Sequence, residues 1–461
     1  MTTSRKSILA ILLLGLAIRL GLCISNPRDL TTDHDGYLAH ARMVANGEGF
    51  SGPFTSRPTA FRPPAYPVCL GLLIRCGVSD SLCVAIINIA SSLVILWLTM
   101  KLALQSGLSL AGTFAAMLGV ALDPLLIRYT SLPMTEVPCA AILLAAVVWY
   151  RSSRNSLMPL PEPSAPAPAR PVSTWTMIVS GILFGAGGLV RPVLLISCAF
   201  LTVGAVVSSW RERRRQRCAD NAATPATHSF LLSTFRFSVV LPAIVAAFTI
   251  TPWIIRNAIV FGHFIPATTH GGYTLALGNN QAFYRDVIRG PDRFPWDGES
   301  LNAWQQQMNA ASRADGVSAA DEPAQDAWYY DHAFAAVRAE PWSFLKASVL
   351  RLKRFWAISA ADTQSSRIMT LAVSTWYGLL WIGLAFQFIG CWFHRKSKQF
   401  RGSGELWLVV FSFLLMHAVY WTDTRMRAPV MPILCVLSVA GWSVAADIAE
   451  SSRTRHKAAR T

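Results

Sequence analysis

The chain has 461 residues, of which 53% are hydrophobic and only 14% are charged. Soluble globular chains carry about 25% charged residues, so this composition excludes an ordinary soluble domain. The net charge of +16 could indicate nucleic-acid binding, but the basic residues occur in short clusters between long apolar runs. That distribution is typical of a polytopic membrane protein with basic cytoplasmic loops.

Apolar runs long enough to cross a hydrocarbon core about 30 Å thick recur along the chain. They predict an all-α polytopic membrane protein with about ten transmembrane helices. The expected spans are 7–24, 80–104, 108–128, 134–150, 174–190, 192–208, 236–257, 368–393, 404–421 and 429–449. No small-residue cleavage site follows the first run, so we expect an uncleaved first helix.

The basic clusters predict the orientation. With the N-terminus in the cytoplasm, nearly all of them face the cytoplasm: the chain start, the linker with Arg151 and Arg170, Arg211–Arg217, His394–Arg401 and the C-terminal tail. The segment Pro63–Gly77 is apolar but short, and counting it as a span would put the Arg211 cluster outside. We expect it to form a helix on the outer membrane surface.

This topology divides the chain into three parts. Residues 1–257 form an N-terminal transmembrane module with an outer loop at 25–79, residues 258–367 form an extracytoplasmic region, and residues 368–461 hold the last helices and a basic tail. The Pro/Ala-rich linker 158–171 is expected to be disordered. The amphipathic stretch 326–356 is expected to lie along the membrane interface, with Trp and Lys/Arg outward.

The expected outer face collects many charged side chains, which are costly near a membrane and usually face a cavity or a partner. They are Asp33, His34, Asp35, Arg57, Arg62, Asp123, Arg128, Glu136, Arg191, Arg256, Asp423, Arg425 and Arg427. Each has a local interpretation, such as a snorkelling arginine or a helix cap at Asp35 or Glu136. Together they suit a phosphate-bearing lipid substrate, with arginines for the phosphate and a carboxylate as base.

A series of short motifs runs along the chain: "DHDGYLAHA", "GEGF", "PTAFRPPAYP", "LPMTEVPCAAILLA", "LVRPV", "PWIIRNAIVFGHFIP", "GNN" and "RMRAPVMPIL". In sequence and in order these motifs resemble those of bacterial membrane glycosyltransferases of the GT-C superfold, including the protein O-mannosyltransferase-like family and the aminoarabinose and galacturonic acid transferases of lipopolysaccharide. The resemblance implies a GT-C fold and an inverting transferase. It also implies a polyprenyl-phosphate sugar donor and a lipid, glycan or protein acceptor.

The resemblance also implies roles for single residues. Asp33 stands four residues before Tyr37, as the family's catalytic aspartate does, and Glu136 matches a second acidic position. His34 stands where many members have an acidic residue, which leaves Asp35 as a rival base. The candidate substrate-binding residues are Tyr37, Arg57, Arg62, Arg128, Arg191, Arg256, Arg425 and Arg427.

Some alternatives stay open on the sequence. A transporter or flippase of a lipid-linked sugar would also explain arginines that face a cavity. In a non-catalytic membrane assembly protein, the grouping of these charged residues on one face would have no functional meaning. A divalent metal is neither required nor excluded by two Asp and one Glu on different loops. The run "GILFGAGG" lies inside an apolar helix and indicates close helix packing instead of a dinucleotide loop. We expect a cytoplasmic-membrane protein in contact with the bilayer, with both termini inside, its active site on the outer face, and no nucleic-acid partner.

Overall fold

The computed structural model describes residues 2–53, 55–155, 174–219, 228–290, 296, 298–358, 366–393 and 403–458. Within these ranges the regular structure is helical, with an isolated β-bridge between Ser51 and Pro58 and no sheet. The predicted all-α class is therefore confirmed for the described chain. The linker 158–171, expected to be disordered, lies outside the described residues.

Long helices form the bundle, and shorter helices connect them. The long helices are α1 (Thr2–Ser25), α4 (Asp80–Gln105), α7 (Glu136–Asn155), α9 (Val193–Ala219), α10 (His228–Phe261), α16 (Arg367–Phe393) and α18 (Met431–Ala458). The shorter helices are α2 (Tyr37–Ala45), α3 (Ala65–Arg75), α5 (Leu110–Ala121), α6 (Pro124–Arg128), α8 (Thr174–Gly188), α11 (Gly271–Gly278), α12 (Gln281–Phe283), α13 (Gly298–Ala314), α14 (Glu322–Ala339), α15 (Pro341–Phe355) and α17 (Ser403–Val419). Segments of 3-10 or π geometry are η1 (Asp29–Thr31), η2 (Tyr129–Ser131), η3 (Tyr284–Ile288) and η5 (Thr424–Val430).

The number of membrane spans differs from the sequence prediction. In the described chain, 6 helices are long and apolar enough to cross a membrane, or 7 if the bent pair of α5 and α6–η2 is one span. The remaining expected spans are helical, but α8 has 15 residues and α17 has 17. At 1.5 Å per residue such helices rise about 22–26 Å, less than a hydrocarbon core of about 30 Å. Helix α7 has 20 residues but carries Glu136 and Arg151 near its ends.

The expected span 108–128 is not one straight helix. It bends by 45° at a break between α5 and α6, where Asp123 caps the start of α6 with its side chain. The break exposes backbone carbonyls at the end of α5, and these accept from the buried Arg19 of α1. Its guanidinium lies 3.0 Å from the Ala121 carbonyl oxygen and 3.4 Å from that of Val120. A buried arginine thus satisfies groups that a helix end leaves unpaired in lipid.

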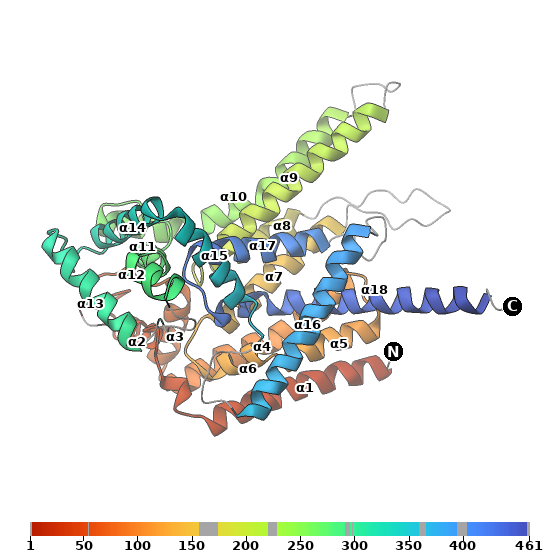
Figure 1. Cartoon of the computed structure of the whole chain (residues 1–461), viewed down its shortest axis with the longest axis horizontal. Helices are drawn as coiled ribbons and strands as arrows, with labels where there is room; N and C mark the ends of the chain where they lie inside the picture. Colours follow the sequence, from red (N-terminus) through yellow and green to blue (C-terminus); the bar gives the residue numbers. More distant parts are fainter. Residues whose placement is uncertain are drawn as a thin grey trace.

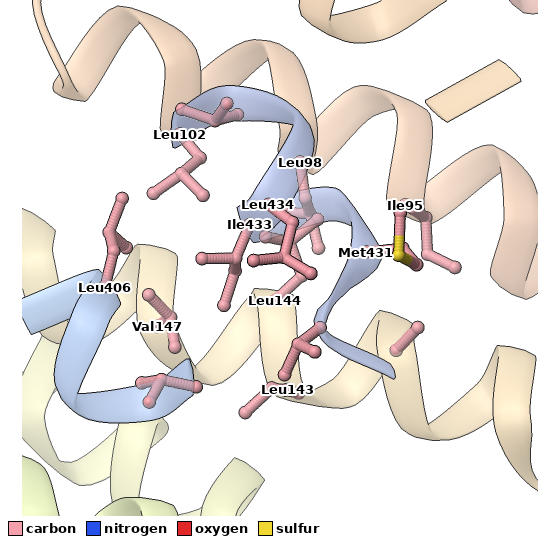
Figure 2. Packing of buried hydrophobic residues seen from close by; sticks show 14 of the residues in the cluster. Ile95, Leu98, Leu102, Leu143, Leu144, Val147, Leu406, Met431, Ile433 and Leu434 are labelled. Carbon is pink, nitrogen blue, oxygen red and sulfur yellow. The ribbon is translucent and has the colours of Figure 1, made fainter. Parts of the chain in front are cut away.

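Helix α18 lies at the centre of the bundle. Its most apolar stretch is 78% buried, whereas the corresponding stretches of the other five candidate spans are between 17% and 44% buried. Figure 2 shows Ile433 and Leu434 of α18 packed among leucines of α4 and α7 and against Leu406 of α17. The other spans are correspondingly more peripheral and face the lipid over more of their surface.

The two ends of the molecule are built from different elements. Helices α2, α3 and α11 to α14 gather at one end of the long axis, and the start of α1 and the end of α18 lie at the other (Figure 1). Helix α3 has 11 residues, too short to cross the membrane at 1.5 Å per residue. Which end faces outward stays a prediction from the basic clusters.

Residues between α10 and α16 form a helical body around an aromatic core that includes Phe283, Tyr284, Trp296, Trp304, Trp328 and Tyr329. Arg351 of α15 joins this body to the bundle. Its Nη2 donates to Oδ1 of Asn279 at 3.0 Å, and its Nη1 donates to the Val419 carbonyl of α17. The "GNN" motif is therefore placed against a buried arginine at the junction with α17.

The glycine-rich run of α8 packs against α10, as predicted from the sequence. A Cβ on Gly181 would lie 2.7 Å from the Pro242 carbonyl oxygen, and a Cβ on Gly185 would lie 2.7 Å from that of Ala246. Because backbone atoms cannot move aside cheaply, these positions need glycine for close helix approach.

We expect Gly185→Ala to lower the thermal unfolding midpoint in detergent, because overpacking costs about 1–3 kcal/mol. Gly378→Ala in α16 is the matched control, since nothing lies within 4 Å of its Cβ position. That change should leave stability unchanged or raise it by up to about 1 kcal/mol. Unfolding of Gly185→Ala at or above the parental midpoint would contradict the packing described for α8 and α10.

Candidate active site

Asp33 lies in the loop that leads into α2, four residues before the first residue of the helix. Its Oδ2 accepts a hydrogen bond from the backbone N–H of Ala39 at 2.8 Å, and Gly36 provides the turn with a φ of 77°. The carboxylate therefore occupies a helix N-terminus, where negative charge is favourable. Its Oδ1 is buried and has no hydrogen-bond partner among the described residues. One oxygen fixes the side chain, and the other remains available as an acceptor.

Asp35 lies between two arginines from distant parts of the chain. Its Oδ1 is 3.4 Å from Nη2 of Arg62, and its Oδ2 is 3.1 Å from Nη1 of Arg425. Burial raises the pKa of Asp35, but the charges of Arg425, Arg62 and Arg191 outweigh this effect, so the pKa lies below its usual value. Asp35 is ionised at neutral pH and joins the first loop to η5.

Arg191, in the turn between α8 and α9, forms an ion pair with Glu136. Its Nη2 is 2.6 Å from Oε1 of Glu136, and its Nε donates to Oγ1 of Thr135 at 2.8 Å. The Glu136 side chain is fully buried, and its Oε2 has no hydrogen-bond partner within the described part of the chain. A buried carboxylate is stable here because a charged, hydrogen-bonded partner compensates for the loss of water.

These three ion pairs belong to one group. We call Asp35, Arg62, Glu136, Arg191 and Arg425 the arginine–carboxylate cluster. Its members come from the α1–α2 loop, the segment before α3, the start of α7, the α8–α9 turn and η5. The charges of Arg191 and Arg425 both act on Asp35, and Arg425 also lies within electrostatic range of Glu136. Five segments far apart in sequence therefore meet around a few charged groups.

Two tyrosines form a wall of this cluster. The Tyr37 and Tyr66 rings are buried and pack edge to face, with their centres 5.5 Å apart. The Arg62 guanidinium carbon lies 5.6 Å from the centre of the Tyr37 ring. Tyr66 is within electrostatic range of both Glu136 and Asp33.

The other candidate arginines have different partners. Arg256 donates to the backbone carbonyls of Thr59 and Phe50 at 2.8 and 3.0 Å. The buried Arg427 donates to two carbonyls at the end of α15, those of Phe355 at 2.7 Å and Ala357 at 2.6 Å. These bonds hold loops and helix ends together.

The two remaining candidates lie in exposed positions. Arg128 pairs with Asp29 in η1, and its side chain is half-exposed. Arg57 is exposed in the first loop. Neither is brought into the arginine–carboxylate cluster.

Two residues of the region beyond α10 support the site and were not predicted from the sequence. Oε2 of Glu322 accepts from the Ala60 backbone N–H and from Oγ1 of Thr269, each at 2.9 Å. His270 packs on Phe61 with ring centres 4.3 Å apart. Burial and the nearby charge of Arg62 lower the pKa of His270 to about 3, so its ring is neutral at physiological pH. No local sequence pattern marks contacts of such long sequence separation.

Within the described ranges no three His, Cys, Asp or Glu side chains come together as metal ligands.

Comparison with solved structures identifies the class of fold. The archaeal oligosaccharyltransferase AglB from Archaeoglobus fulgidus, in complex with an inhibitory peptide and a dolichol-phosphate, superposes with a TM-score of 0.52 over 99% of this chain at 12% identity. The apo form of the Archaeoglobus fulgidus oligosaccharyltransferase gives 0.51 over 98% at 14% identity. Its complex with Zn and sulfate gives 0.50 over 96% at 13% identity. The chain spans about half the length of these proteins, 52%, 52% and 49%.

At these identities the likeness concerns the fold alone. No protein-family profile matches the chain, and no curated protein matches it by sequence. The chain is a multi-pass membrane protein with a GT-C-like fold. Membership of a particular glycosyltransferase family stays a prediction.

The orientation can be tested with single cysteines. In a background with Cys69, Cys76 and Cys218 replaced by serine, Ala319→Cys should react with a membrane-impermeant thiol reagent on intact cells. Arg214→Cys should react only after the cells are opened, because the basic end of α9 is expected inside. Ala319 and Arg214 are both exposed in the structure. The reverse labelling pattern would overturn the proposed sidedness of the site.

Proposed function

We propose that this protein is a membrane glycosyltransferase that moves a sugar from a polyprenyl-phosphate donor to an acceptor hydroxyl, with inversion. The observation that carries the proposal is the arginine–carboxylate cluster beside Asp33, at one end of a GT-C-like bundle. The expected place of action is the outer face of the cytoplasmic membrane. The acceptor can be a lipid, a glycan or a protein. The dolichol-phosphate in the AglB complex supports a lipid-phosphate donor here by analogy of fold.

In the proposed reaction Asp33 is the general base. Its Oδ1 takes the proton of the acceptor hydroxyl while the hydroxyl oxygen attacks the anomeric carbon. The bond between that carbon and the phosphate oxygen breaks, and its electron pair stays on the departing phosphate. The hydrogen bond from Ala39 to Oδ2 supports this role because it fixes the carboxylate and leaves Oδ1 free. In-line attack opposite the leaving phosphate inverts the configuration.

The arginines Arg62, Arg191 and Arg425 are proposed to hold the phosphate. A guanidinium presents five N–H donors, and the ion pairs with Asp35 and Glu136 occupy only some of them. The carboxylates orient the arginines before the lipid arrives, so little reorganisation is needed as negative charge develops on the leaving group. Asp35 and Glu136 thus position the arginines, and Tyr37 supports Arg62 from below its guanidinium.

The roles of the two aspartates can be separated by matched substitutions. Asp33→Asn keeps the shape of the side chain and removes the base, so sugar transfer should fall about 10²- to 10⁴-fold. Asp35→Asn weakens two ion pairs and should mainly raise the KM for the lipid donor. Asp80→Asn is the control, because Asp80 pairs with Arg42 away from the cluster. The three variants are compared in membranes at equal protein levels. An inactive Asp35→Asn beside an active Asp33→Asn would reverse the two assignments.

The Arg191–Glu136 pair allows stability to be separated from catalysis. Arg191→Gln leaves the buried Glu136 without its counter-charge, so both stability and transfer should fall. Adding Glu136→Gln removes the unpaired charge and should restore the unfolding midpoint. The donor KM should stay about 10- to 100-fold above the parental value, the usual effect of one charge-assisted bond to phosphate. Full recovery of transfer in the double variant would show that Arg191 has only a structural role.

A further inference from the structure

Helix α15 (Pro341–Phe355) has two opposite faces. Its buried side chains recur every four residues: Ser343, Ala347, Arg351 and Phe355. Successive residues of an α-helix are rotated by about 100°, which places Trp342, Leu345 and Val349 on the other side. Their exposed fractions are 76%, 49% and 54%. An apolar stripe of this size is unfavourable in water, so this face of α15 is suited to contact with an apolar medium.

Basic residues lie on the same exposed side. Lys346 and Lys353 are exposed, and with Trp342, Leu345 and Val349 they fall within about 100° of arc. The helix contains no Asp or Glu. Lysine side chains can lay their methylenes along an apolar surface and extend their ammonium groups to a polar layer. A face of Trp, Leu and Val with flanking lysines is typical of helices that lie in the headgroup layer of a membrane.

The position of α15 agrees with this environment. The helix runs across the direction of α1, α5 and α18 (Figure 1). The next described helix, α16, is a candidate span, and its first turns expose Ile368, Met369 and Leu371 by 82%, 59% and 69%. An exposed apolar surface thus occurs on both helices, and on α16 it belongs to a segment with the length and composition of a membrane span.

An apolar groove begins where α15 ends. It has a volume of about 350 Å³, lies between α16 and α17, and is lined by Trp356, Trp381, Phe388 and Trp407 among others. Trp356 directly follows α15, is partly buried, and packs against the core of the bundle. None of these residues belongs to the arginine–carboxylate cluster. The groove therefore runs along α16 from the end of α15.

We propose that this surface binds an anionic glycerophospholipid of the surrounding membrane. The phosphate of its headgroup lies at Lys346 and Lys353, and one acyl chain lies in the groove at Trp356. Anionic headgroups attract juxtamembrane basic residues, and the groove buries apolar chain surface. The bound lipid holds α15 at the interface and, through Arg351, supports the body that contains Asn279. This inference is independent of the proposed transferase activity.

The location of α15 is tested with fluorescent probes on the full-length protein in nanodiscs. Trp342→Cys and Val349→Cys are labelled with an environment-sensitive dye, in the background with Cys69, Cys76 and Cys218 replaced by serine. Gln306→Cys on the exposed side of α13 is the control. Lipids that carry a nitroxide should quench the first two probes and spare the third. Quenching of all three by aqueous iodide, with none by the nitroxide lipids, would overturn the proposal.

The lipid itself is identified by mass spectrometry of the purified protein. The double change Lys346→Glu with Lys353→Glu should abolish preferential retention of phosphatidylglycerol over phosphatidylethanolamine. Arg313→Glu with Arg338→Glu is the control with the same change of charge, at exposed positions of α13 and α14. The glutamine versions of both lysines are used if the glutamate variant does not fold. Equal retention in all variants, or polyprenyl phosphate bound in place of phospholipid, would contradict the assignment.

Discussion

The bridging of Asp35 by Arg62 and Arg425 is the contact on which the rest of the site depends. The two arginines are 27 and 390 residues away along the chain. Their contact with one carboxylate joins the first loop to η5, which leads directly into the central helix α18. The same η5 places Met426 beside Arg191, whose Nη1 lies 3.7 Å from the methionine sulfur. The ion pairs of Asp35 and Glu136 are therefore held together by a single short segment.

The buried and partly buried arginines discussed above fall into two groups with different partners. Arg19, Arg256, Arg351 and Arg427 donate to backbone carbonyls at helix ends and loops. In lipid such carbonyls have no water, so these arginines stabilise irregular backbone near the membrane. Arg62, Arg191 and Arg425 pair with carboxylates instead. An anionic phosphate can share the donors of the second group without breaking the backbone contacts that hold the fold.

Part of this arrangement could be predicted from the sequence. Hydropathy located the helices of the bundle, because it depends on local composition. The motifs around Glu136, Arg191 and Arg425 pointed to residues that the structure brings into one cluster. The helix break at Asp123 was not predicted, because the carbonyl groups at the break are stabilised by Arg19, which lies on another helix. The sequence also could not distinguish Arg256 and Arg427 from the cluster arginines, since only tertiary contacts show which acceptors surround a guanidinium. Glu322 was missed for the same reason: it contacts Ala60, 262 residues away.

The most direct measurement of the central claim is a double-mutant cycle between Asp35 and Arg425. Binding of a polyprenyl phosphate is measured for the parental protein, Asp35→Asn, Arg425→Gln and the double variant, in nanodiscs of constant composition. If Asp35 orients Arg425 for the phosphate, the two changes are coupled by about 0.5–3 kcal/mol, as for residues in direct contact. The double variant should then bind only slightly more weakly than Arg425→Gln alone. Strictly additive losses, or unchanged binding in all three variants, would contradict the account of this site as a preorganised phosphate site.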